Sequence, residues 1–133
     1  MTYPVLRQPD FHKPFVIYTD ASDYAMGAAL CQEHEEKMCV VAYCSRAFAG
    51  PEKNYSVQEK ECLGIVFATK KFRRYLLGGN FTVRIMTDHS SLQYLTNSRE
   101  IGGRIARWAM IMSEYNYKVE YLKGKLNVVG DAL

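Results

Sequence analysis

The 133-residue chain contains no apolar run that approaches membrane-spanning length, and its first residues do not form a signal peptide. The segment Met1-Thr-Tyr-Pro-Val5 is neither basic nor followed by an apolar core with a cleavage site. The sequence also lacks internal repeats and low-complexity tracts, which excludes solenoids and repetitive linkers. With 48% hydrophobic residues, a chain of this length is expected to form one soluble, globular domain.

Cysteine is scarce, and none of the four residues has the CxxC spacing typical of zinc sites or redox motifs. We therefore expect reduced core thiols in an intracellular protein, rather than a disulfide framework, at Cys31, Cys39, Cys44 and Cys62. Basic residues exceed acidic ones only slightly, with 17 Lys and Arg against 14 Asp and Glu. A formal net charge of +3 permits binding to a polyanion but does not require it.

Three of the four prolines lie in the first 14 residues, which show no hydrophobic periodicity. This composition predicts that residues 1–14 form a connector and that the folded domain comprises residues 15–133. A lead-in of this kind is typical of a domain excised from a longer polypeptide.

Two strand-like stretches with the same pattern organise the rest of the chain. Phe15–Ser22 is rich in aromatic and β-branched residues and reaches Asp20 at its carboxyl end, and Phe81–Asp88 repeats the pattern. Taken alone, Asp20 is equally well explained as a strand-end residue that turns into a loop. If the two strands are parallel neighbours, however, Asp20 and Asp88 emerge at the same edge of one sheet, where open α/β sheets place their sites.

The remaining periodicity predicts an alternation of strands and helices. A meander of three antiparallel strands is followed by a long helix that ends at Gly78-Gly79, and a fourth strand, two helical segments, a fifth strand and a final short helix come next. Besides the two stretches above, the expected elements are strands Ala25–Gln32, Met38–Ser45 and Asn116–Leu122, a polar turn His34–Lys37, helical segments Ser90–Leu95 and Arg104–Glu114, and a helix from Asn127.

Two acids of the long helix have different expected roles. Ser56-Val-Gln-Glu59 is a capping-box sequence, which assigns Glu59 to the helix start. Glu61 has no such role, and it shares the sheet-facing side of the helix with Ile65 and Phe72. A carboxylate there is either a destabilising, unpaired charge or a metal ligand.

Closely spaced carboxylates repel one another, and hard divalent cations relieve that repulsion. The chain offers Asp20, Glu61, Asp88 and, near its end, Asp131. Two Mg²⁺ ions about 4 Å apart activate water and stabilise the leaving oxygen in an in-line displacement at phosphorus. From spacing alone, scattered surface charges remain the alternative.

The chain resembles the RNase H domain of Ty3/Gypsy-type LTR-retrotransposon reverse transcriptases. The matching residues follow the family's order along nearly the whole chain: Pro9-Asp-Phe, Lys13-Pro-Phe, Tyr18-Thr-Asp-Ala-Ser22, Ala42-Tyr-Cys-Ser-Arg46, Asn54-Tyr55, Glu59-Lys-Glu61, Thr87-Asp-His89, Ser91-Leu92, Arg104-Ile-Ala-Arg-Trp108, Tyr121-Leu-Lys-Gly124 and Asn127-Val-Val-Gly-Asp-Ala-Leu133. This resemblance implies an α/β ribonuclease H-like fold with a five-stranded mixed sheet, in the order 3-2-1-4-5, flanked by helices.

The resemblance also implies an endonuclease that cuts the RNA strand of RNA–DNA hybrids during reverse transcription of a retroelement. By motif position it assigns the catalytic, metal-binding acids as Asp20, Glu61, Asp88 and Asp131, with two Mg²⁺ ions as cofactor and Mn²⁺ as a substitute. The implied partners are the hybrid and a polymerase or connection domain of the same polyprotein. The implied location is the cytoplasm or a virus-like particle.

Substrate contacts are predicted from donors close to the acids. Ser22, Gln32 and Ser90 are candidates for the 2′-hydroxyls that distinguish RNA from DNA, and Arg104 is a candidate for phosphate. For each basic residue a solvated helix face is an equally good interpretation. The rival function is a catalytically weak or domesticated module that binds hybrids or proteins.

The chain departs from the family at its end. Gly130 stands where relatives usually have Ala before the last Asp, which loosens a short helix by up to about 1 kcal/mol. Lys123–Val129 contains no histidine, so the assistance that some relatives take from one there is missing. The helix from Asn127 to Leu133 spans fewer than two turns, and we therefore predict Asp131 to be the weakest of the four ligands.

Overall fold

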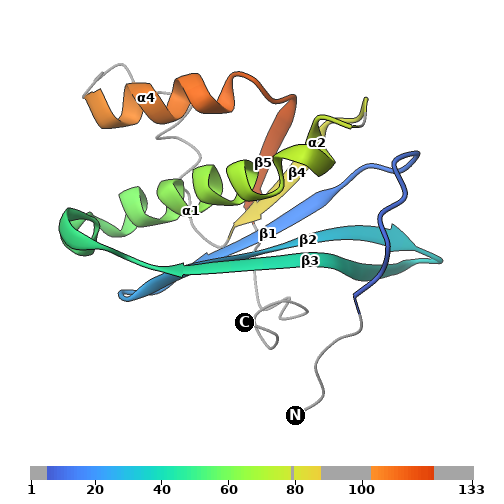
Figure 1. Cartoon of the computed structure of the whole chain (residues 1–133), viewed down its shortest axis with the longest axis horizontal. Coiled ribbons are helices and arrows are strands. Elements are labelled where there is room, and N and C mark those ends of the chain that lie inside the picture. The colour runs from blue at the N-terminus through green and yellow to red at the C-terminus, as the bar shows by residue number, and fades with distance from the viewer. Residues whose placement is uncertain (1–5, 79, 88–102, 122–133) are drawn as a thin grey trace, which may run out of the picture.

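The computed structural model describes residues 6–78, 80–87 and 103–121. Within these residues the chain forms a single five-stranded sheet (Figure 1). The strands are β1 (Val16–Ala21), β2 (Ala25–His34), β3 (Lys37–Ala47), β4 (Val83–Thr87) and β5 (Tyr117–Tyr121). The helices are η1 (Gly50–Asn54), α1 (Val57–Lys71), α2 (Arg73–Leu76) and α4 (Gly103–Met112).

The sheet has the strand order β3-β2-β1-β4-β5, which confirms the predicted ribonuclease H-like arrangement. The first three strands form an antiparallel meander, whereas β4 runs parallel to β1 and β5 parallel to β4. The β1–β4 register pairs Val16 with Arg84 and Tyr18 with Met86. The central strand β1 therefore has an antiparallel neighbour on one side and a parallel neighbour on the other.

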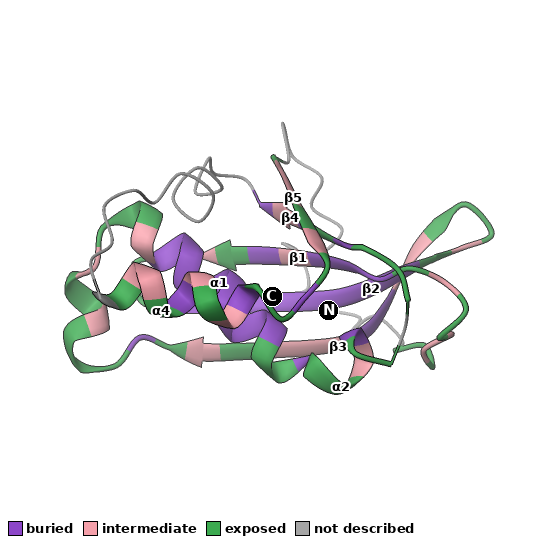
Figure 2. Ribbon diagram, turned by 90° about the horizontal axis from the view of Figure 1, so that it is seen from above, coloured by how far each residue is buried: buried purple, intermediate pink, exposed green. Residues whose placement is uncertain are grey.

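Helices α1 and α4 lie on one face of the sheet, with α1 directly against the strands and α4 packed on α1 (Figure 1). Ten consecutive residues of α1, Lys60–Thr69, are buried, as expected for a helix between a sheet and a second helix. Ile17, Ile65, Ile85 and Met112 are completely buried in this core. The central strands and the inner side of α1 are accordingly purple in Figure 2.

The long helix is shorter than predicted. The sequence predicts one helix up to Gly78, but α1 ends at Lys71, and the one-turn α2 follows it. Phe72, with φ −98° and ψ 13°, separates them, and its ring is 3% exposed. Burial of this aromatic side chain accompanies the departure from helical geometry, and no glycine or proline is involved.

The turn between β2 and β3 lies at His34–Lys37, as predicted, and the strands extend up to it on both sides. His34 pairs with Lys37, so the loop consists of two residues only, Glu35 and Glu36. Both have positive φ angles, 53° and 67°, as in a type I′ hairpin turn. Neither is the Asn or Gly that such a turn favours, so the sequence predicts the position of the turn but not its type I′ geometry.

The cysteine prediction is partly confirmed, because none of the four cysteines forms a disulfide but only Cys31 and Cys62 are fully buried. Cys39 and Cys44 are half-buried. Burial raises the pKa of the Cys31 thiol to about 12 and that of Cys44 to about 11, so both thiols are protonated at neutral pH. In the described part of the chain no helix is long and apolar enough to span a membrane.

Candidate active site

Asp20 lies near the carboxyl end of the central strand β1, opposite Gly27 of β2. Asp20 is exposed, although the residue before it, Thr19, is buried. On the other side β4 ends at Thr87, and the next residue in sequence is Asp88, which lies outside the described residues. The register pairs Tyr18 with Met86, and these residues precede Asp20 and Asp88 by two positions each.

Glu61 lies in the amino-terminal half of α1 and is 4% exposed. The prediction that it occupies the buried side of the helix is therefore confirmed. Glu61 lines a hollow of about 260 Å³ together with residues that directly follow Asp20 in the chain. The hollow is lined by Ala21, Ser22, Asp23, Val57, Lys60 and Glu61. These residues come from the end of β1, the turn after it and the start of α1. The end of β1 and the start of α1 lie at the same end of the molecule (Figure 1).

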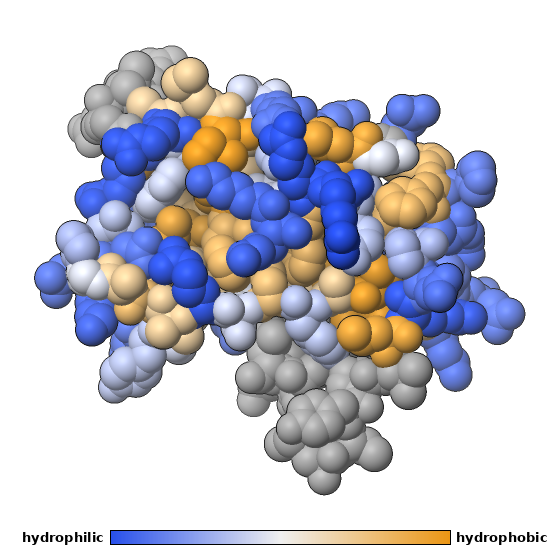
Figure 3. Space-filling view, viewed as in Figure 1, coloured by the Kyte–Doolittle hydropathy of each residue, from blue (hydrophilic) through white to orange (hydrophobic). Residues whose placement is uncertain are grey.

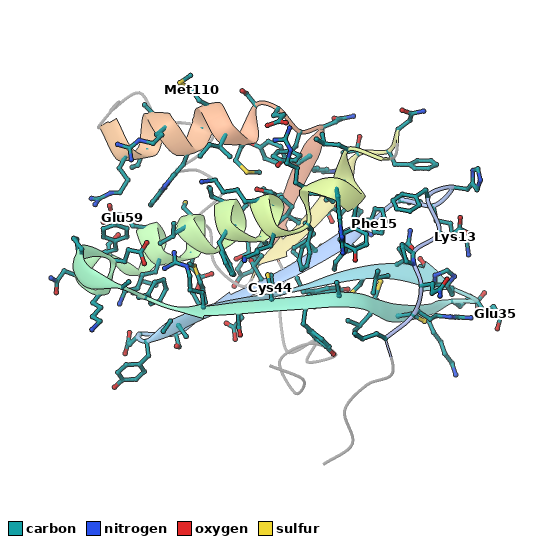
Figure 4. All side chains as sticks on the ribbon, viewed as in Figure 1. Lys13, Phe15, Glu35, Cys44, Glu59 and Met110 are labelled. Atoms are coloured by element: carbon teal, nitrogen blue, oxygen red, sulfur yellow. The ribbon has the colours of Figure 1, made fainter. Side chains whose placement is uncertain are left out.

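Glu59 has the structural role that its capping-box position predicts. The Ser56 amide donates to Glu59 Oε1 over 3.0 Å, and the Glu59 amide donates to Ser56 Oγ over 3.1 Å. The Ser56 amide is the main reason that the pKa of Glu59 is below its ordinary value, and Arg104 contributes further. Figure 4 shows Glu59 at the beginning of α1. Glu59 therefore stabilises the helix that carries Glu61.

Arg104, a predicted phosphate contact, connects α4 to the start of α1. Its Nη2 lies 2.8 Å from Glu59 Oε2, and its guanidinium lies 4.0 Å from the centre of the Tyr55 ring. The Tyr55 ring in turn packs on Trp108, with 6.1 Å between the ring centroids. The Arg104 side chain is still 43% exposed, so its substrate role stays a prediction. A phosphate at this position must compete with Glu59.

Ser22, a predicted substrate donor, is exposed beside the hollow, but its hydroxyl already organises the β1–β2 turn. Ser22 Oγ accepts hydrogen bonds from the amides of Tyr24 and Ala25, at 3.2 and 3.1 Å, and lies 3.2 Å from the Ala25 carbonyl oxygen, to which it donates. Side-chain caps of this type are common in turns. Its predicted contact to a substrate hydroxyl remains untested.

The prediction that Gln32 contacts the substrate is contradicted by its surroundings. The side chain is completely buried. Its amide donates to the carbonyl oxygens of Asp10, at 2.6 Å, and Lys13, at 3.1 Å, and its Oε1 accepts from the Asp10 amide at 2.8 Å. Gln32 thus fastens the lead-in segment to β2. The sequence predicts Gln32 as a donor close to the acids, whereas in the structure its side chain satisfies buried backbone groups of Asp10 and Lys13.

Three predicted site residues, Asp88, Ser90 and Asp131, lie outside the described residues. Within the described ranges no three side chains of His, Cys, Asp or Glu come together as a metal site. The two described acids, Asp20 and Glu61, nevertheless belong to elements that meet around the hollow. Oxygen donors without nitrogen or sulfur fit a hard divalent cation such as Mg²⁺. The donor chemistry is therefore compatible with the predicted cofactor.

Lys60 is a site residue that sequence reasoning missed. It lines the hollow next to Glu61 and is only 8% exposed. Lysine is almost never this buried without partners. Lys60 is part of the stretch Glu59-Lys-Glu61 that matches the family. Its position directly before a buried helical residue is a weak signal, because lysine usually reaches solvent from such positions.

Residues 10–115 match the model of a family described as the RNase H-like domain found in reverse transcriptase. The chain is 48% identical over 130 residues to the Retrovirus-related Pol polyprotein from transposon 297 of Drosophila melanogaster, covering 98% of this chain and 12% of that protein. It is 40% identical over 133 residues to the Transposon Tf2-3 polyprotein of Schizosaccharomyces pombe, covering 98% of this chain and 10% of that protein. It thus spans about a tenth of these relatives.

Solved structures share the fold at lower identity. A foamy viral protease-reverse transcriptase in complex with an RNA/DNA hybrid superposes with a TM-score of 0.68 at 20% identity, over 92% of this chain and 17% of that chain. LC11-RNase H1 superposes with a TM-score of 0.62 at 15% identity, over 90% of this chain and 91% of that chain. These comparisons and the relatives confirm both the resemblance and the fold expected from the sequence.

Proposed function

Since this chain belongs to the family of RNase H-like domains found in reverse transcriptases, we propose that it hydrolyses the RNA strand of RNA–DNA hybrids with two divalent metal ions. The observation that carries the proposal is Glu61, a nearly buried carboxylate beside the turn that follows Asp20. Burial of a carboxylate is costly unless it is hydrogen-bonded, paired with a cation or bound to a metal ion, and a metal ion is the partner that we propose for Glu61.

The proposed metal ligands are Asp20, Glu61, Asp88 and Asp131, with Mg²⁺ as the cofactor and Mn²⁺ as a substitute. When bound, the two ions supply positive charge and an activated water for in-line displacement at phosphorus. The two described acids differ in burial, which suggests different roles. Glu61 is held on a capped, buried helix, while Asp20 is exposed at the strand end and accessible to a phosphate.

The proposed substrate is an RNA–DNA hybrid, contacted mainly through its phosphates. Hydrophilic side chains are interleaved with hydrophobic ones on the side of the molecule seen in Figure 3. Exposed cations near the carboxyl end of α1 are available to a polyanion, namely Lys70, Lys71 and Arg74. Arg73 is less available because it forms an ion pair with Glu114. The relatives are polyproteins, and we propose that this domain works beside a polymerase domain of the same polypeptide.

The test is cleavage of a hybrid with a labelled RNA strand, with double-stranded RNA and double-stranded DNA of the same sequence as controls. We expect cleavage of the RNA strand of the hybrid only, dependent on Mg²⁺ and abolished by a chelator. Binding of the hybrid without cleavage, at any Mg²⁺ or Mn²⁺ concentration, would favour the binding module instead.

A further inference from the structure

Lys60 occupies an unusual environment for a lysine. It stands between Glu59 and Glu61 on α1 and is 8% exposed, in contrast to Lys70 and Lys71 at the exposed end of the same helix. Transfer of an ammonium group from water into a protein is unfavourable unless its donors are satisfied. The contacts that compensate for this burial therefore indicate what the residue does.

Those contacts connect α1 to the turn between β1 and β2. Lys60 Nζ donates to the Asp23 carbonyl oxygen over 3.2 Å and lies 5.3 Å from the centre of the Phe48 ring. Phe48 also contacts this turn, because its amide donates to the Tyr24 carbonyl oxygen over 2.9 Å. Two consecutive carbonyl groups of the turn are thus fixed, one by α1 and one by the segment after β3.

The turn that Lys60 holds is part of the candidate site. It begins directly after β1, the strand that carries Asp20, and its residues Ser22 and Asp23 line the same hollow as Lys60 and Glu61. The Lys60 hydrogen bond consequently connects the helix that presents Glu61 with the turn that ends the strand of Asp20. It crosses 37 positions in sequence and joins the two elements that must be held in register.

We propose that Lys60 is a positioning residue that fixes the separation of the Asp20 strand end and Glu61 for divalent metal binding. This inference rests on the proposed function. A methionine has a similar length and packs on Phe48 without the cost of burying a charge, so the fold alone does not require a lysine here. Positioning residues behind metal ligands typically change metal affinity about 10- to 100-fold when they are removed.

Three possible roles of Lys60 give different results for Lys60→Met. If the ammonium acted only as a charge near the carboxylates, its removal would tighten metal binding, because a cation no longer competes. If it were needed only for folding, the melting temperature would fall. If it positions the turn, metal affinity falls while the melting temperature of the metal-free protein stays close to that of the wild type.

The experiment measures Mn²⁺ binding by calorimetry and melting temperature by circular dichroism, both without nucleic acid. The variants are the wild type, Lys60→Met, Asp20→Asn and the matched control Lys53→Met, which changes an exposed lysine of η1. We expect Lys60→Met to bind Mn²⁺ at least about tenfold more weakly at an unchanged melting temperature, and Lys53→Met to match the wild type in both.

Unchanged or tighter Mn²⁺ binding by Lys60→Met would overturn the inference, and so would a large loss of thermal stability relative to Lys53→Met. The Asp20→Asn variant separates this failure from failure of the proposed function. If Asp20→Asn binds Mn²⁺ as well as the wild type does, or the wild type does not bind it, the metal site itself is wrong. If Asp20→Asn loses binding and Lys60→Met keeps it, only the role of Lys60 is wrong.

Discussion

Glu59 and Glu61 stand two positions apart on α1 but have different surroundings. Glu59 caps the helix and pairs with Arg104, whereas Glu61 is nearly buried beside the hollow. The sequence was sufficient to separate them, because the capping box used one acid and the helical phase placed the other toward the sheet. A carboxyl-to-amide change at each position therefore separates the structural role of Glu59 from the catalytic role proposed for Glu61 in two isosteric variants.

Glu61→Gln should lower the hybrid cleavage rate by on the order of 100-fold or more, the loss found when a charge-stabilising group is removed from a reaction centre. Glu59→Gln should cleave at nearly the wild-type rate, since glutamine still completes the capping box. It should cost about 1 kcal/mol of stability, because the helix start loses a negative charge and the exposed pair with Arg104 is broken. Single-turnover cleavage and urea unfolding measure these effects. An inactive Glu59→Gln with an active Glu61→Gln would reverse the assignment.

Glu52 gives a prediction for the pH dependence of stability. Its carboxylate accepts two hydrogen bonds from Arg46, at 2.9 and 3.1 Å, and one from the Ala49 amide at 3.0 Å. The Arg46 hydrogen bonds are the main reason that the pKa of Glu52 lies below its ordinary value of 4.5. A depressed pKa in the folded state means that the stabilisation is complete above the unfolded pKa and is lost as the pH falls through the folded pKa.

The stability difference between the wild type and Glu52→Gln should therefore be constant near neutral pH and shrink below about pH 4.5, at which the unfolded carboxyl group titrates. We expect no more than about 1 kcal/mol at pH 7, because Arg46 is partly exposed. Urea unfolding of both proteins from pH 7 to pH 3 measures the difference. A gap that widens toward acid pH would contradict the assigned ion pair.

Among the elements, the β2–β3 hairpin has the least favourable local sequence. Glu35 and Glu36 both adopt positive φ, which costs roughly 1–2 kcal/mol per non-glycine residue and less for asparagine. Strand pairing on both sides holds the turn in place, as the pairing of His34 with Lys37 shows. Figure 4 shows Glu35 at the opposite end of the molecule from Glu59. The strain is therefore remote from the candidate site.

The double substitution Glu35→Asn and Glu36→Gly should raise the free energy of unfolding by roughly 1–2 kcal/mol, since Asn-Gly favours the type I′ turn. Hybrid cleavage should not change. The test compares urea midpoints and cleavage rates with those of the wild type, and Glu33→Asn, at an exposed strand position before the turn, serves as the control for loss of one acidic charge. A lower urea midpoint for the double variant would show that the two glutamates make contacts that the turn geometry does not reveal.

At the level of elements, prediction succeeded where local chemistry and tertiary packing agree. The start of α1 was predicted because Ser56 and Glu59 satisfy its first amides locally. The predicted end of α1 at the glycines was wrong: the helix ends at Lys71, and the buried Phe72 after it leaves helical geometry, a change that accompanies tertiary packing and has no local sequence signal. The position of the β2–β3 turn at His34–Lys37 was predicted from its polar residues, but its geometry was not, because pairing of β2 with β3 imposes a turn type that Glu35-Glu36 does not favour.

For the whole molecule, the strand order was predicted from the resemblance to the RNase H family, and the repeated strand pattern ending in Asp20 and Asp88 supported parallel neighbours. The structure confirms the order β3-β2-β1-β4-β5. The parallel pairing of β1 with β4 matters most, since it brings together strands that are far apart in sequence. The contacts of Gln32 and Lys60 were not predictable from the sequence, because each is made to a backbone carbonyl that only the tertiary fold brings close. Gln32 donates to the carbonyl oxygen of Asp10, and Lys60 donates to that of Asp23.

The central claim is that the end of β1 and the start of α1 form a metal-dependent nuclease site. Asp20→Asn tests it most directly, since the exposed Asp20 side chain can lose its charge without opening a cavity in the core. The measurement is single-turnover cleavage of a labelled RNA–DNA hybrid in Mg²⁺ by the wild type and Asp20→Asn, with the fold of both verified by circular dichroism. We predict hybrid cleavage by the wild type and none above background by Asp20→Asn at equal fold content. Comparable cleavage by the two proteins would contradict the account.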